Sequence, residues 1–100
     1  MLPLISIITP TYNRAYTLDR LYNSLVTQDS EKFEWIIIDD GSTDETRKKC
    51  LGYINDSIFK IQYYKQNNSG KPAAINLGVT KAVGDYIFIV DSDEALTLNA

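Results

Sequence analysis

Short apolar runs alternate with amphipathic stretches along the chain, and polar or turn-forming residues come after each run. Four runs are short and rich in isoleucine, valine or aromatic residues, as is typical of strands buried in a sheet. The predicted strands cover residues 4–9, 33–40, 60–65 and 86–90. Pro10 is expected to end the first strand.

Three stretches between the strands predict helices. The first covers residues 15–26, and its buried stripe is formed by Leu18, Leu21, Tyr22 and Leu25. The second is expected to start at Ser42, because Ser42 and Glu45 match a capping box. Its inner side is expected to carry Cys50, Leu51 and Ile54. The third is expected to run from Pro72 to Gly84, with a face of small residues suited to close packing on a sheet.

The order of these elements predicts a three-layer α/β/α sandwich. Helices separate all the strands, so the sheet should be mostly parallel and covered on both faces. If the first three strands run outward in the order 3-2-1, the fourth must lie on the other side of strand 1. The predicted order is therefore 3-2-1-4, in a single small domain over residues 1–100.

Polar clusters lie after three of the strands, at their carboxyl ends. The clusters are Pro10-Thr11-Tyr12-Asn13, Asp39-Asp40-Gly41-Ser42 and Asp91-Ser92-Asp93. In open parallel sheets, ligands bind beyond the carboxyl ends of the strands, where the strand order reverses. We therefore expect the clusters to converge on one binding site between strands 1 and 4.

The predicted site is rich in carboxylates and has few nearby cations. Carboxylates gathered in this way repel one another unless a cation or donor groups share the site. Oxygen ligands without nitrogen or sulfur favour a hard divalent ion, Mg²⁺ or Mn²⁺. Two protein carboxylates would leave coordination positions free for the phosphate oxygens of a substrate, whose charge the metal would neutralise.

Each polar cluster also has a structural interpretation. Asp93 could cap a helix that begins at Glu94. A tight turn accounts for Gly41 and Ser42 but does not require two acids, so we assign Asp39 to the turn and Asp40 to function. The loop at residues 68–71 could cradle a phosphate through its backbone N–H groups and Lys71, or could be a polar loop with a solvated lysine.

Composition narrows the possible functions. The net charge is −3, and no basic patch exists beyond Arg47-Lys48-Lys49, so nucleic acid is not an expected partner. No apolar run approaches the roughly 20 residues that span a bilayer. The chain has no histidine and only one cysteine, Cys50, which excludes serine–histidine and cysteine–histidine catalytic pairs, histidine- or cysteine-pair zinc sites and an intramolecular disulfide.

Together, the motifs resemble family 2 glycosyltransferases of the GT-A fold. The matching segments are residues 5–13, 35–44, 84–87 and 91–93, with Asn68, Gly70, Ala74, Asn76 and Gly78 between them. Each motif is weak by itself, but the ordered set is specific and spans nearly the whole chain. In this family, residues 91–93 would be the DxD motif.

The resemblance implies binding of a nucleoside-diphosphate sugar, and a UDP-sugar is the donor expected first. Pro10 and Tyr12 would contact the base and ribose, and Asp40 would accept a hydrogen bond from the base. Lys71 would lie near the nucleotide. The implied substrate-binding residues are Pro10, Thr11, Tyr12, Asp40, Lys71, Asp91 and Ser92, and the implied metal ligands are Asp91 and Asp93.

Family enzymes are more than twice as long, and their second half supplies the acceptor site and, in inverting members, a carboxylate base. We therefore expect a truncated donor-binding domain without catalytic residues of its own, from a glycan-building enzyme that is cytoplasmic and peripheral to the membrane. The fourth strand would then be an open edge, which predicts self-association. Its exposed apolar residues would be Tyr86, Ile87, Phe88, Ile89 and Val90.

Two other classes of protein remain as alternatives. One is an inactive nucleotide-binding or interaction module that keeps the fold. The other is a phosphoryl-transfer domain with an aspartate nucleophile, such as a haloacid dehalogenase or a receiver domain. Those families place their paired acids after an early strand, whereas here the first strand leads into Pro10 and Thr11.

Overall fold

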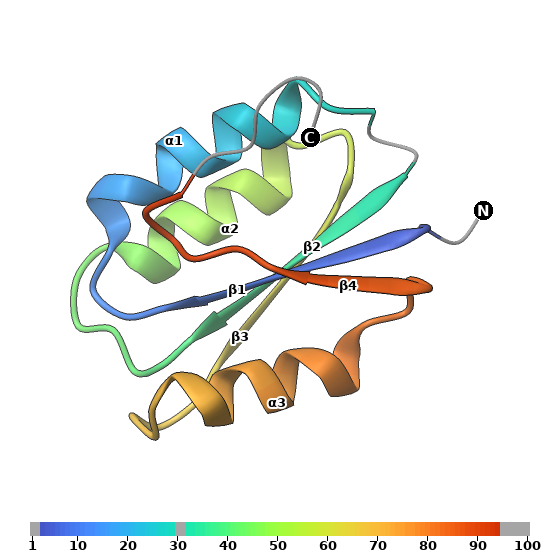
Figure 1. Ribbon diagram of the computed structural model, residues 1–100. Coiled ribbons are helices and arrows are strands. Elements are labelled where there is room, and N and C mark those ends of the chain that lie inside the picture. The colour runs from blue at the N-terminus through green and yellow to red at the C-terminus, as the bar shows by residue number, and fades with distance from the viewer. Residues whose placement is uncertain (1–2, 30–31, 95–100) are drawn as a thin grey trace.

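The computed structural model describes residues 3–29 and 32–94, which form alternating strands and helices (Figure 1). The elements are β1 (Ile5–Thr11), α1 (Ala15–Val26), β2 (Phe33–Asp39), α2 (Thr46–Asp56), β3 (Lys60–Lys65), α3 (Lys71–Lys81) and β4 (Tyr86–Ile89). All strand pairs are parallel, and the order is β3-β2-β1-β4. The predicted fold class and strand order are therefore confirmed.

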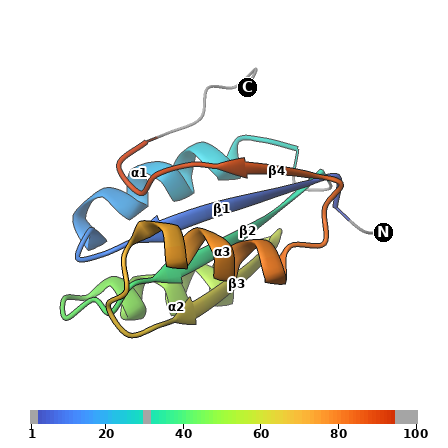
Figure 2. The same cartoon turned by 60° about the horizontal axis from the view of Figure 1, so that its bottom comes forward.

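Helices cover both faces of the sheet. α1 and α2 lie on one face and α3 lies on the other, as Figures 1 and 2 show from two directions. Alternate residues of β2 face the two layers: Trp35 and Ile37 pack in the core beneath α1 and α2, and Ile36 and Ile38 pack against α3. Every residue of β2 is buried, which explains its continuous apolar run.

The prediction that the first strand ends at Pro10 is wrong. β1 continues through Thr11, although β4 pairs only with Ile5–Ile8 of β1. The carbonyl of Ile8 accepts from Val90 on the β4 side, and Pro10, two residues further on, presents its backbone nitrogen to the same side. Because β4 has ended its pairing there, the missing N–H of Pro10 costs no ladder hydrogen bond.

The capping box predicted for the second helix is also wrong. α2 begins at Thr46, and the Ser42 hydroxyl instead accepts a hydrogen bond from the backbone N–H of Asn13 at 2.8 Å. Asp44 Oδ1 takes the role of the cap, because it accepts from the backbone N–H of Thr46 at 3.0 Å. Cys50 is buried on the inner face of α2 as predicted, beside Thr46 and Tyr53. The predicted Leu51 and Ile54 are exposed instead.

Two glycines allow the backbone to pack closely around β1. A Cβ at Gly78 of α3 would lie 2.5 Å from Cγ2 of Ile8, which bears out the predicted small-residue face. Gly84 does not end the third helix as predicted, because α3 ends at Lys81. A Cβ at Gly84 would lie 2.8 Å from the backbone of Ile5 and Ser6, so this glycine permits the α3–β4 connection to pass directly over β1.

The amino end of the sheet contains a fully buried acid, Glu34. Its carboxylate accepts hydrogen bonds from Ser6 Oγ at 2.6 Å, Gln62 Nε2 at 3.0 Å and the backbone N–H of Val83 at 2.8 Å. Burial works against ionisation of Glu34, but these donors outweigh it and hold the pKa below its usual range, with a further contribution from Lys60. This network joins three strands to the α3–β4 connection.

Candidate functional site

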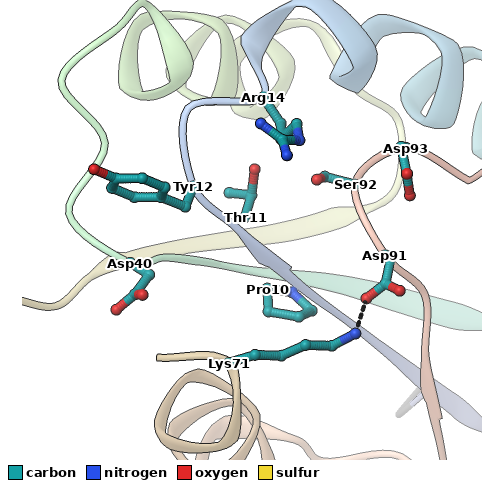
Figure 3. A pocket seen from close by; sticks show the side chains of 9 residues that line it. All are labelled: Pro10, Thr11, Tyr12, Arg14, Asp40, Lys71, Asp91, Ser92 and Asp93. Carbon is teal, nitrogen blue, oxygen red and sulfur yellow. Dashed lines mark ion pairs between the residues drawn. The ribbon is translucent and has the colours of Figure 1, made fainter. Parts of the chain in front are cut away.

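A pocket of about 290 Å³ opens at the carboxyl end of the sheet, between β1 and the segment after β4 (Figure 3). Its lining residues are Pro10, Thr11, Tyr12, Arg14, Asp40, Lys71, Asp91, Ser92 and Asp93. The structure thus brings together every residue proposed from the sequence for substrate or metal binding. The pocket also contains one residue that the sequence analysis did not name, Arg14.

Asn13 fixes the loop that carries the first cluster. Its φ of 51° lies in the left-handed region, which asparagine tolerates better than most residues, and it turns the chain from β1 into α1. Its side-chain oxygen accepts from the backbone N–H groups of Thr43 at 2.8 Å and Asp44 at 3.3 Å. The β1–α1 and β2–α2 loops therefore hold each other in place, with Tyr12 exposed at the pocket mouth.

Asp39 is structural, as its position in the turn predicts. The residue is fully buried, and its Oδ1 accepts from the backbone N–H of Ser42 at 2.8 Å. Its other oxygen accepts from the Tyr63 hydroxyl at 2.5 Å. Burial raises the pKa of Tyr63, and this hydrogen bond raises it further, so Tyr63 remains a neutral donor.

Asp40 binds the loop that precedes α3. Its carboxylate accepts from Gln66 Nε2 at 2.8 Å and from the backbone N–H groups of Ser69 at 2.7 Å and Gly70 at 3.0 Å. Desolvation opposes ionisation, but these donors hold the pKa of Asp40 below its usual range. The phosphate cradle suggested for this loop is therefore wrong as regards Ser69 and Gly70, whose N–H groups are already used.

Lys71, the first residue of α3, reaches across the pocket to Asp91. The Nζ of Lys71 lies 2.7 Å from Oδ1 of Asp91 (Figure 3). This hydrogen bond and the charge of Asp91 raise the pKa of Lys71, so the lysine stays protonated. Both side chains are about half exposed, so the pair can exchange with other ions at little cost.

The segment after β4 forms a turn that presents Asp91 and Asp93 at the pocket. Glu94 closes the turn: its carboxylate accepts from the backbone N–H of Asp91 at 2.7 Å, and its own N–H donates to the Asp91 carbonyl at 3.0 Å. The alternative in which Asp93 caps a helix concerns residues 95–100, which lie outside the described residues.

The donor set of the pocket fits a hard divalent ion shared with a ligand. Within residues 3–29 and 32–94, no group of three or more histidine, cysteine or acidic side chains could hold a metal by itself. Asp91 and Asp93 would therefore supply two carboxylates, and the ligand's oxygens would complete the coordination shell. Asp91 would have to release Lys71 to do so.

Arg14 changes the expected charge of the site. The side chain is exposed, and its guanidinium points toward the pocket side of Thr11 and Ser92 (Figure 3). It forms no ion pair with any other described residue. Arg14 and Lys71 thus oppose three pocket carboxylates, so the site is richer in cations than expected. Arg14 directly follows the Pro10–Asn13 cluster, and this position is the feature of the sequence that could have indicated its place in the pocket.

The helices of the chain give no sign of a membrane-crossing segment. None of the helices in the described parts of the chain combines the length and the apolar composition that a bilayer span requires.

A sequence profile, "Glycosyl transferase family 2", matches residues 6–99. An uncharacterised glycosyltransferase from Haemophilus influenzae is 42% identical over 97 residues, which are 93% of this chain and 37% of the relative. The poly(ribitol-phosphate) beta-N-acetylglucosaminyltransferase TarS of Staphylococcus aureus is 36% identical over 91 residues, 89% of this chain and 16% of TarS. The chain thus spans well under half the length of these relatives.

Solved structures show the same architecture. A TarS fragment in complex with UDP-GlcNAc superimposes with a TM-score of 0.88 at 33% identity, over 99% of this chain and 28% of that one. A mannosyltransferase from Pyrobaculum calidifontis in complex with GDP-Man and Mn²⁺ has a TM-score of 0.87 at 25% identity, over 95% and 29% of the two chains. Both share the GT-A fold.

Proposed function

The chain belongs to glycosyl transferase family 2, and we propose that its pocket binds a nucleoside-diphosphate sugar, a UDP-sugar first of all. In the intact enzyme, the sugar would pass to an acceptor hydroxyl. The observation that carries the proposal is the convergence of the three polar clusters on one pocket at the carboxyl end of the sheet. The TarS complexes with UDP and UDP-GlcNAc support it.

The β1 side of the pocket is proposed to hold the base and ribose. Tyr12 is 45% exposed, so its ring can cover a base without first leaving a core. Asp40 is kept ionised by its three donors, and a carboxylate has about four lone-pair positions. One acceptor position of Asp40 therefore remains for a donor on the base, beside Pro10.

Asp91 and Asp93 are proposed to hold Mg²⁺ or Mn²⁺ with the diphosphate. When bound, the metal would neutralise the charge that grows on the diphosphate as it leaves the sugar. Without the metal, Lys71 forms an ion pair with Asp91. We propose that Lys71 turns to the nucleotide, so that its charge remains in the pocket when Asp91 takes up the ion. The P. calidifontis structure with Mn²⁺ supports divalent metal use in the family.

The donor site is proposed to be the whole contribution of residues 1–100. The H. influenzae relative extends over nearly three times the matched length, since the match covers 37% of it. The acceptor site and the catalytic base would then lie in a segment that this sequence does not include. Cytoplasmic action at the membrane periphery belongs to the same proposal. An inactive nucleotide-binding or interaction module is the alternative. A titration with nucleotides tests whether the chain binds a nucleotide at all.

β4 is proposed to mediate self-association. Its four residues are between 41% and 60% exposed, although all are apolar or aromatic. Val90 does not share this edge as predicted, because it is buried in the core beneath α1 and α2. A strand with one unpaired edge offers free backbone groups to a second chain. Sedimentation equilibrium at high concentration should show dimers or larger species, and a clean monomer would contradict this proposal.

The deciding experiment is calorimetric titration of the chain with UDP, with and without Mn²⁺, and then with GDP. We expect Mn²⁺ to tighten UDP binding, and we expect Asp93→Asn to weaken binding in the presence of Mn²⁺ by about tenfold or more, because a metal ligand is lost. Asp85→Asn is the matched control, because Asp85 is exposed at the amino end of β4 and does not line the pocket. Absence of UDP and GDP binding by a folded chain would refute a donor site in these residues. Binding without sugar transfer is the result expected of a donor site that lacks its acceptor half, so sugar transfer by the intact enzyme is the measurement that separates it from the inactive module.

A further inference from the structure

We propose that Thr11, Arg14 and Ser92 form an anion subsite that binds a phosphate group of the ligand directly, without a metal. The inference rests on the proposed function, because the phosphate would belong to the donor's diphosphate. It adds a second means of holding that group, on the opposite side of the pocket from the Lys71–Asp91 pair (Figure 3).

The Thr11 hydroxyl is the main observation. Thr11 is 4% exposed, and its Oγ1 is the only buried side-chain polar atom without a hydrogen-bond partner among the described residues. Thr9, two residues earlier on β1, is also buried, but its Oγ1 accepts from Trp35 Nε1 at 2.9 Å. A buried hydroxyl without a partner destabilises the fold, so the folded protein would be more stable with valine in place of Thr11. The hydroxyl is therefore explained by a partner that arrives with the ligand.

Arg14 is the second, independent observation. A guanidinium presents five N–H donors in a planar fork that matches the oxygens of a phosphate. Lys71, the other cation of the pocket, is already paired with an acid, whereas Arg14 has no ion-pair partner in the described residues. In Figure 3 the Arg14 guanidinium and the hydroxyls of Thr11 and Ser92 point toward one region of the pocket.

These three side chains offer donors and no negative charge. Such a set suits an anion with several acceptor oxygens better than it suits a base or a sugar. The Thr11 oxygen is covered in the free protein, so an arriving anion must turn the hydroxyl toward the pocket. The exposed Arg14 side chain, whose Nη1 donates to the Asn13 carbonyl at 3.4 Å, must also move onto the anion. Because Arg14 carries no structural ion pair, that movement costs little.

The test is an NMR titration of amide chemical shifts in EDTA, with UDP, uridine and inorganic pyrophosphate as probes. The variants are Thr11→Val, Thr11→Ser and Arg14→Gln. Arg20→Gln is the matched control, because Arg20 lies exposed on α1 and does not line the pocket. Thermal unfolding of each variant shows whether it folds.

Thr11→Val and Arg14→Gln should each weaken UDP and pyrophosphate binding by about fivefold or more, and should leave uridine binding unchanged. Thr11→Ser and Arg20→Gln should bind like the wild type. Thr11→Val should unfold at the same temperature as the wild type or higher, because it removes an unpaired buried hydroxyl.

Three binding results would overturn the inference and leave the proposed function intact. The first is UDP binding that occurs only with Mn²⁺. The second is unchanged UDP binding by Thr11→Val and Arg14→Gln. The third is a loss of uridine binding in Thr11→Val as large as its loss of UDP binding, which would mean that the hydroxyl contacts the nucleoside. A lower unfolding temperature for Thr11→Val would show that Oγ1 has a partner in the free protein, and would also count against it. If the folded wild type binds none of UDP, GDP and pyrophosphate, with or without Mn²⁺, the proposed function fails as well.

Discussion

The two ends of the sheet handle polar groups in opposite ways. At the amino end, Glu34 is completely buried, and donors from Ser6, Gln62 and Val83 satisfy its carboxylate within the protein. At the carboxyl end, Thr11 is also buried, but its hydroxyl has no partner among the described residues. The contrast agrees with a structural role for the amino-end polar groups and with the proposed role of Thr11 in binding a ligand at the carboxyl end.

Asp40 shows that the division applies to individual groups and not to whole regions. It lies at the carboxyl end, yet it accepts three hydrogen bonds from the loop before α3. Asp40 thus holds the loop in place and also remains a charged group at the pocket. Lys71 and Asp91 form an intermediate case, because they satisfy each other across an exposed and exchangeable contact.

The largest effect is expected from Glu34→Ala. The substitution leaves Ser6, Gln62 and the N–H of Val83 without their acceptor in a buried region, which should cost about 3 kcal/mol of unfolding free energy. Urea denaturation measures the loss. Glu45→Ala, at an exposed acid, is the control and should change stability by less than about 0.5 kcal/mol. Equal effects of the two substitutions would show that the network is not stabilising.

Acid should weaken the fold through carboxyl groups at both ends of the sheet. The folded-state pKa values of Glu34 and Asp40 lie below their ordinary values of 4.5 and 3.8, so the unfolded chain binds more protons in this range. Stability is therefore complete above about pH 5 and falls as the pH drops through the folded-state pKa values. Unfolding free energies measured from pH 7 to pH 2 should show this slope, and Glu34→Gln should flatten it. An unchanged slope in Glu34→Gln would show that Glu34 does not contribute to the loss of stability in acid.

Asp40→Asn should weaken binding, whereas Glu34→Gln should not. The amide keeps the shape of the side chain but loses the charge, so UDP affinity should fall about tenfold, while Glu34→Gln should leave the affinity of the folded protein unchanged. Calorimetry on both variants makes the comparison. If Glu34→Gln weakened binding as much as Asp40→Asn, the contrast between the two ends of the sheet would be lost.

Lys71→Met should give the smallest effect and the most specific one. Removal of the ammonium frees Asp91, so Mn²⁺ alone should bind a few-fold more tightly, while UDP with Mn²⁺ should bind more weakly. Electron paramagnetic resonance of free Mn²⁺ measures the first change, and calorimetry the second. Lys81→Met, at the far end of α3, is the control. Weaker binding of Mn²⁺ alone would show that Lys71 does not compete with the metal for Asp91.

Local patterns in the sequence were enough for the layers, the strand order and, except for Arg14, the residues that meet at the pocket. Continuous apolar runs such as residues 35–38 can be buried only between two layers of helices, and each polar cluster begins where a strand ends. Errors arose where the decisive contact is distant. Ser42 matches a local capping box, yet its hydroxyl is used by Asn13, 29 residues away in the sequence.

By itself, the sequence determined a parallel α/β sheet and a polar site at its carboxyl end, because both depend on the period of the apolar residues and on the polar residues at the end of each strand. Only the tertiary structure decided which polar groups find a hydrogen-bond partner within the described residues and which do not. The partners of Glu34 come from β1, β3 and the α3–β4 connection, up to 49 residues away. Whether Thr11 has a partner depends on side chains that only folding brings to the end of β1, and no local pattern encodes their positions.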